Sequence, residues 1–150
     1  MFCRFKRSIG EVFCSERMQG DMMEVEAIGT FDVKLTPIGS GESPIGSMSI
    51  DKTFDGDLQA TSIGQMLAFR SGVEGSAGYV AMERVTGTLG GREGSFTLQH
   101  SGLMDKGAPS LTVVVVPDSA IGGLAGLTGT MNIVATPGRH DYQFRYMLPD

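Results

Sequence analysis

The sequence predicts an all-β protein, an eight-stranded antiparallel up-and-down barrel, from three observations. Apolar and polar residues alternate over short segments that turn-forming residues separate. No stretch has sustained helical periodicity, and no connection offers the crossover helix that a parallel sheet requires. The 22 glycines follow no collagen period, which is typical of many tight turns. A two-sheet sandwich is the main alternative, but only the regions around Pro37 and Pro117 offer loops that could switch sheets.

The first four strands are expected between clear turn signals. The first alternates over Val25 to Leu35 and is followed by a Gly/Ser/Pro loop over 37–44. Asp55-Gly56 is a strong signal for a two-residue hairpin. A turn over 71–76 contains two glycines. The remaining strands of this half are expected at Met48–Phe54, Leu58–Arg70 and Gly78–Leu89.

The second half follows the same pattern. Gly90-Gly91 predicts a tight hairpin, and Pro137-Gly138 joins the last two strands. The continuous apolar run Leu111–Val116 predicts a central buried strand. The segment Pro117–Leu124 has room for one short helical turn. The other strands are expected at Arg92–Met104, Leu127–Ala135 and His140–Leu148, with a turn over Asp105–Pro109.

Composition limits the function classes. The chain has 150 residues, 41% of them hydrophobic, which is enough for one domain with one core. The net charge of -5 argues against a nucleic-acid partner, because such proteins need a basic surface for phosphates. No apolar run is long enough to span a bilayer, so no membrane partner is expected.

Residues 1–22 differ from the rest, and we expect a flexible, disordered tail before a single barrel domain over 23–150. Both cysteines, Cys3 and Cys14, lie in this tail, so the domain has no disulfide framework and a cytoplasmic location is expected. The basic start is no signal peptide, because Glu11 and Glu16 interrupt its apolar segment. A redox or metal-binding cysteine pair is the functional alternative. A start codon assigned too far upstream of Met22 would explain the tail entirely.

The hairpin at Gly90-Gly91 fixes which side chains share a face. A two-residue loop places Leu89 opposite Arg92, and directly opposed residues lie on the same face of the sheet. The apolar set predicts the inward face, with these opposed pairs: Val85 with Phe96, Glu83 with Leu98, Ala81 with His100, and Tyr79 with Gly102. Glu83 and His100 are then diagonal neighbours within side-chain reach.

The same alternation places a few polar groups inside a mostly apolar lumen. Lys52 shares a face with Ile50 and Phe54, and Tyr142 and Tyr146 point inward from the last strand. Lys52 and Glu83 should pair with each other, with His100 or with water, since an unpaired buried charge is costly.

Two interpretations of these polar groups stay open. A structural network that fixes the register is as reasonable as a ligand site in an apolar cavity. For a ligand site, Glu83 and His100 are the candidate catalytic residues, because burial moves their pKa values toward neutrality. The candidate pocket residues are Lys52, Tyr79, Phe96, Tyr142 and Tyr146.

Other motifs are weak. The glycines over 87–94 form a hairpin and precede no helix that could bind a phosphate. The two histidines match no standard metal spacing, so neither a metal nor a cofactor is expected.

Six segments of the chain form a combination of motifs: Asp51–Phe54 with Gly56–Leu58, Gly78–Glu83, Gly87–Arg92, Gly94–His100, Val116–Ser119 and His140–Tyr146. Together these segments resemble the bacterial domain of unknown function 3224. The resemblance covers about Val25 to Leu148, and it implies an eight-stranded barrel similar to allene oxide cyclase. Such barrels and the related dirigent-type barrels bind a hydrophobic, reactive substrate in the lumen and often form dimers or trimers through the outer face. No catalytic motif of these relatives matches this chain, so no catalytic role is transferred.

Three functions therefore compete. The first is a barrel that binds a small, largely apolar molecule in its lumen, as a cyclase or isomerase with Glu83 and His100 handling protons. The second is a non-catalytic carrier or sensor that uses the same pocket. The third is a structural homo-oligomer whose lumen is filled by its core. A lumenal cavity would separate the first two from the third.

Overall fold

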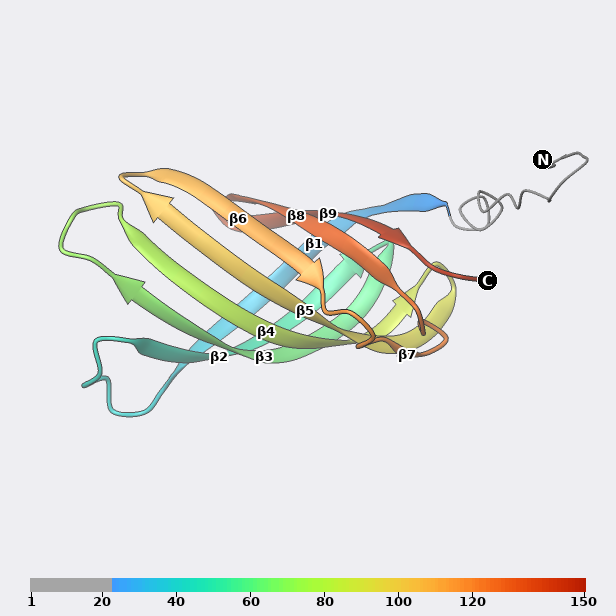
Figure 1. The fold of residues 1–150 in the computed structure, drawn as a ribbon, viewed down its shortest axis with the longest axis horizontal. Helices are drawn as coiled ribbons and strands as arrows, with labels where there is room; N and C mark the ends of the chain where they lie inside the picture. The colour runs from blue at the N-terminus through green and yellow to red at the C-terminus, as the bar shows by residue number, and fades with distance from the viewer. Residues whose placement is uncertain (1–22) are drawn as a thin grey trace, which may run out of the picture.

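The computed structural model describes residues 23–150 and confirms a closed antiparallel barrel (Figure 1). The predicted tail, with Cys3 and Cys14, lies outside the described residues. The strands are β1 (Glu24–Ile38), β2 (Gly46–Gly56), β3 (Leu58–Arg70), β4 (Ala77–Leu89), β5 (Arg92–Asp105), β6 (Ala108–Val115), β7 (Ile121–Gly122), β8 (Thr128–Thr136) and β9 (Arg139–Met147). Among these residues, no helix is long and apolar enough to cross a membrane.

Eight of the strands form the barrel wall, and β7 is a two-residue addition. Each wall strand pairs with two neighbours, and the circle is completed by β4 with β5 and by β1 with β9. This closure rules out the two-sheet sandwich, because a closed sheet has no free edges. The β1–β2, β3–β4 and β5–β6 connections gather at one end, here called the mouth end (Figure 1).

The β4–β5 hairpin has the predicted register. Leu89 lies opposite Arg92, and Ala81 lies opposite His100. The two loop residues adopt positive φ angles of 60° at Gly90 and 79° at Gly91. Glycine adopts this conformation without steric cost, and a turn of this hand matches the twist of the flanking strands. The inward face of both strands follows from this one turn.

The prediction of a two-residue hairpin at Asp55-Gly56 is wrong. Phe54 lies opposite Ala60, so the β2–β3 connection is wider, and β2 continues to pair with β1 as far as Gly56. Two bonds to β1 hold the turn: the Asp57 amide donates to the carbonyl of Ile28 at 3.0 Å, and the Ile28 amide donates to Asp57 Oδ2 at 2.9 Å. The turn is thus shaped by a neighbouring strand as well as by its own residues.

Tyr142 of β9 also supports this turn. Its hydroxyl accepts a hydrogen bond from the Leu58 amide at 2.9 Å and donates to the Asp55 carbonyl at 3.0 Å. Burial raises the pKa of this phenol, so it stays protonated and able to donate. A tyrosine expected to line a pocket therefore braces the fold.

Two predictions for the segment around β6 are also wrong. The run Leu111–Val116 is no strand buried on both faces: Val113 is 2% exposed, whereas Leu111 is 40% exposed. In a closed barrel each strand has an outer face, so only alternate residues are buried. The expected helical turn over Pro117–Leu124 is replaced by β7, which pairs with the part of β5 that β6 leaves uncovered.

The hydrophobic core fills the end of the barrel opposite the mouth. Phe96 and Phe144 stack with ring centroids 5.7 Å apart, and Phe54 meets Tyr142 edge-on at 5.8 Å. Each fully buried side chain of this size contributes roughly 1.5–3 kcal/mol to folding. We call this half of the lumen the packed end; its other large buried members are Leu58, Leu89, Leu98, Leu124 and Leu127.

Candidate functional site

Four polar side chains meet inside the barrel and are almost completely buried: Lys52, Ser62, Glu83 and His100. We call them the polar cluster. Lys52 Nζ lies 2.8 Å from Glu83 Oε2, and His100 Nε2 lies 2.9 Å from the same oxygen. Ser62 Oγ donates to Glu83 Oε1 at 3.1 Å. The predicted pairing of Glu83 with Lys52 and His100 is confirmed.

Strand register alone brings these groups together. Lys52 of β2 lies directly opposite Ser62 of β3. Glu83 of β4 lies opposite Leu98 of β5, so His100 is its diagonal neighbour, as predicted. Four consecutive strands thus contribute one polar side chain each. The sequence analysis missed Ser62, because its assignment depends on the β2–β3 register that the turn signal gave incorrectly.

The cluster keeps a carboxylate ionised in the core. Burial alone would raise the pKa of Glu83, but the hydrogen bond from His100 and the charge of Lys52 outweigh it, so the pKa lies below its ordinary value. Lys52 also lies over the ring of Phe31, with Nζ 4.4 Å from the ring centroid. Within residues 23–150, every buried side-chain nitrogen and oxygen has a hydrogen-bond partner.

His100 connects this cluster to Tyr79. An ionised carboxylate only accepts hydrogen bonds, so His100 Nε2 donates to Glu83. The other ring nitrogen, Nδ1, lies 3.4 Å from the Tyr79 hydroxyl. Burial, and then the negative charge of Glu83, raise the pKa of Tyr79, so its phenol stays protonated. Tyr79, His100 and Glu83 thus form a chain of hydrogen-bonding groups along which a proton can move.

Tyr79 opens onto a cavity of about 710 Å³ at the mouth end. We call it the mouth cavity. Most of its lining is apolar. The lining comes from the inward faces of β3 to β6 and β8, from part of the β1–β2 loop and, at the rim, from the outward-facing Phe69 and Leu103. The inward-facing apolar members and those of the loop are Pro44, Met66, Ala68, Ala77, Gly102, Met104, Pro109, Leu111 and Ala135. Tyr79 is the lining residue that bonds to the polar cluster. Tyr79 therefore links the mouth cavity to the polar cluster.

A glycine makes room for the Tyr79 ring. Gly102 lies directly opposite Tyr79 in the β4–β5 ladder. A Cβ atom at this position would collide with Cε1 and Cδ1 of the ring. The absence of a side chain at Gly102 therefore lets the tyrosine lie across the neighbouring strand inside the lumen.

Comparison with known proteins identifies the family. A sequence model described as "Protein of unknown function (DUF3224)" matches residues 27–146. The chain belongs to the DUF3224 family. A crystal structure of a DUF3224 protein with unknown function from Shewanella oneidensis MR-1 is similar, with a TM-score of 0.77 and 48% sequence identity. The alignment covers 86% of this chain and 98% of that one. No curated protein matches the chain.

The remaining predicted pocket residues of this DUF3224 protein lie elsewhere. Phe96, Tyr142 and Tyr146 all point inward, as expected, but they belong to the packed end and do not line the mouth cavity. Lys52 is buried in the polar cluster. Of the predicted pocket residues, the structure brings Tyr79 alone to the wall of this cavity.

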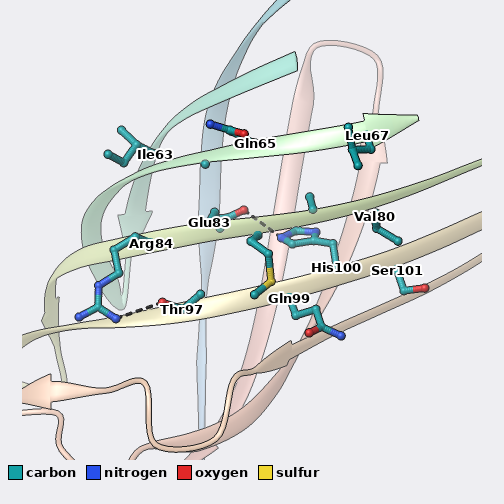
Figure 2. Close-up of a pocket in the computed structure, with 13 residues that line it drawn as sticks. Ile63, Gln65, Leu67, Val80, Glu83, Arg84, Thr97, Gln99, His100 and Ser101 are labelled. Carbon is teal, nitrogen blue, oxygen red and sulfur yellow. Dashed lines mark hydrogen bonds and ion pairs between the residues drawn. The ribbon is translucent and has the colours of Figure 1, made fainter. Parts of the chain in front are cut away.

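A second hollow of the DUF3224 protein, about 840 Å³, lies on the outer face of β3, β4 and β5 (Figure 2). The side chains of Glu83 and His100 turn to the interior, where they bond to one another (Figure 2). Arg84 faces outward and donates to Thr97 Oγ1 and to the Ser119 carbonyl. The other outward side chains of this hollow are Ile63, Gln65, Leu67, Val80, Met82, Gln99 and Ser101.

We predict that Glu83→Gln destabilises the protein by roughly 3–5 kcal/mol, because it leaves Lys52 charged and unpaired in the core. The free energy of unfolding, measured by urea denaturation, checks this. Glu26→Gln is the matched control: its carboxylate is exposed and lies 3.9 Å from Arg145, so its loss should cost no more than about 1 kcal/mol.

The same pair has an expected pH dependence. The pKa of Glu83 is lowered by folding, so its stabilisation is complete above the unfolded-state pKa and is lost as the pH falls through the folded value. The difference between wild type and Glu83→Gln should therefore shrink below about pH 4.3. If Glu83→Gln lowers the free energy of unfolding by only about 1 kcal/mol at neutral pH, Lys52 and Glu83 are not a water-free ion pair, and water solvates Lys52 in the variant.

Proposed function

We propose that this DUF3224 protein binds a small, largely apolar molecule in the mouth cavity of its barrel. The observation that carries the proposal is the cavity itself. Its volume of about 710 Å³ lies in the range of small-molecule sites, and its wall combines apolar side chains with one phenol tied to a charged network. A structural barrel with a filled lumen would leave no such space.

The position of the polar cluster also supports the proposal, because its charges are buried behind Tyr79. Glu83 and His100 are 1% and 4% exposed, so a ligand would meet Tyr79 and not the buried charges. The packed end supplies the core, which frees the mouth end from contributing to stability. We place this function in the cytoplasm, since residues 23–150 contain no cysteine and hence no disulfide framework. The net charge of -5 makes nucleic acid an unsuitable partner.

Filling the cavity tests the proposal. Ala68 lies opposite Tyr79 on β3 and lines the cavity, so Ala68→Trp should abolish binding of the neutral fluorescent probe N-phenyl-1-naphthylamine. Small molecules that co-purify with the wild-type protein, measured by mass spectrometry, should be absent from the Ala68→Trp variant. Leu67→Trp is the control, because Leu67 is the adjacent residue on the outer face and is 49% exposed. Probe binding that survives Ala68→Trp, or is absent in wild type, would refute lumenal binding.

A second candidate function is proton-transfer catalysis, as in an isomerase or cyclase. The arrangement of Tyr79, His100 and Glu83 favours it, because a phenol that contacts a ligand is backed by an imidazole and a carboxylate. Tyr79 would touch the ligand. Its phenol proton would pass to His100 Nδ1, Glu83 would stabilise the resulting imidazolium through Nε2, and the phenolate would accept the carbon-bound proton of the ligand. A carrier or sensor would use the same cavity without this transfer.

Solvent exchange separates the catalyst from the carrier. A catalyst removes a carbon-bound proton of its ligand and returns one from solvent, so the co-purified molecule should gain deuterium when incubated with wild-type protein in D2O. Tyr79→Phe should slow this exchange by roughly a hundredfold or more, while the amount of ligand that co-purifies with the protein stays the same. If the molecule gains deuterium no faster with the protein than in buffer alone, the protein is a non-catalytic carrier or sensor.

The outer face supports a homo-oligomer. Exposed apolar side chains gather on the outer face of β3, β4 and β5, with Gln65, Gln99 and Ser101 among them: Ile63, Leu67, Phe69, Val80, Met82 and Leu103. Exposed apolar patches of this kind mark interaction surfaces. A second copy of the chain would cover them through the same strands.

Sedimentation equilibrium tests the association. Met82 lies in the middle strand of the patch, so Met82→Glu should reduce the mass to that of one chain. Val134→Glu adds the same charge at an exposed apolar residue of β8, outside the patch, and should leave the mass unchanged. Monomeric wild-type protein, or equal effects of both variants, would reject this interface.

A further inference from the structure

The mouth cavity has one charged residue in its wall, Arg70. It is the last residue of β3 and lies opposite Ala77, the first residue of β4. Ala68 and Tyr79 form the next inward pair along the same two strands. Two residues of a strand span about 7 Å, so the cation lies at the rim and the phenol lies one step deeper.

The other arginines of the described chain are all engaged. Arg84 donates to Ser119, Arg92 donates to the Pro149 carbonyl, Arg139 pairs with Asp141, and Arg145 pairs with Glu26. Among residues 23–150, Arg70 forms no ion pair and no side-chain hydrogen bond, although Glu74 shares a smaller hollow with it.

The sign of this charge is opposite to that of the whole chain. The protein carries a formal charge of -5, yet its apolar cavity presents a guanidinium at the entrance. A neutral apolar molecule gains nothing from this group. A carboxylate gains two parallel hydrogen bonds, because the planar fork of arginine matches its geometry.

We infer that the ligand is an amphipathic carboxylate: an apolar body that fills the mouth cavity, with the anionic group at the rim on Arg70. The inference rests on the proposed lumenal binding and specifies its ligand class. The body would contact Leu111 and also Met66 and Met104, whose unbranched side chains can adapt to different apolar shapes. Tyr79 would meet the part of the ligand that lies deepest.

A matched acid and alcohol test this inference. Decanoate and decanol have the same chain and differ in charge at pH 7.5, and each is used to displace N-phenyl-1-naphthylamine from the protein. Arg70→Gln should raise the decanoate concentration needed for half-displacement roughly three- to tenfold, and the decanol concentration by less than about twofold. Arg70→Lys keeps the charge and loses the fork, so it should give a smaller rise with decanoate.

Two controls separate the failure of this inference from the failure of lumenal binding. Arg145→Gln removes the same charge from the outer face of β9 and should change neither concentration. If the probe fails to bind, or still binds to Ala68→Trp, lumenal binding itself is wrong. If the probe binds in the lumen but Arg70→Gln affects acid and alcohol equally or not at all, the carboxylate assignment is overturned and lumenal binding stands. An equal effect of Arg145→Gln on decanoate would also overturn it, because it would indicate general charge attraction.

Discussion

One ionised carboxylate inside a mostly apolar barrel determines the organisation of the lumen. Glu83 needs compensation for the water it has lost, and it receives a cation from β2, a hydroxyl from β3 and an imidazole from β5. These bonds are formed together only when the four strands have the observed register. A shift of one residue in these ladders would turn Lys52 or His100 to the outside and break the bonds to Glu83.

The polar cluster also divides the lumen into two parts with different tasks. On one side, aromatic and leucine side chains pack together in the core, and Tyr142 holds the β2–β3 turn. On the other side, the wall is made of small and flexible residues that leave a cavity. A small domain has little stability to spare, so concentrating the core at one end lets the other end stay open at low cost. His100 and Tyr79 are the link between the two parts.

The sequence predicted what depends on local signals and failed where distant strands decide. The Gly90-Gly91 turn fixed β4 and β5 and so identified Glu83, His100 and Tyr79 as inward neighbours. The β2–β3 turn was assigned incorrectly, since bonds from Ile28 and Tyr142 shape it, and Ser62 was missed with it.

The sequence also could not predict how deep each inward side chain lies along the barrel axis. Alternation tells which face a residue occupies but not how far it lies from the mouth, because depth depends on the tilt of all strands. Tyr146 and Phe96 share the face of Tyr79 and yet belong to the core. Arg70 gave no signal either, since a charged residue at a strand end is common on any surface.

The pairing that closes the barrel also determines how the molecule can be presented to its surroundings. Glu24 lies opposite Met147, so the two ends of the described fold are neighbours in one ladder, at the end of the barrel away from the mouth (Figure 1). A tether, a fused domain or a solid support attached at either end leaves the entrance facing outward. The ends can equally be joined by a short linker and the chain reopened elsewhere, which makes this barrel a natural scaffold for circular permutation.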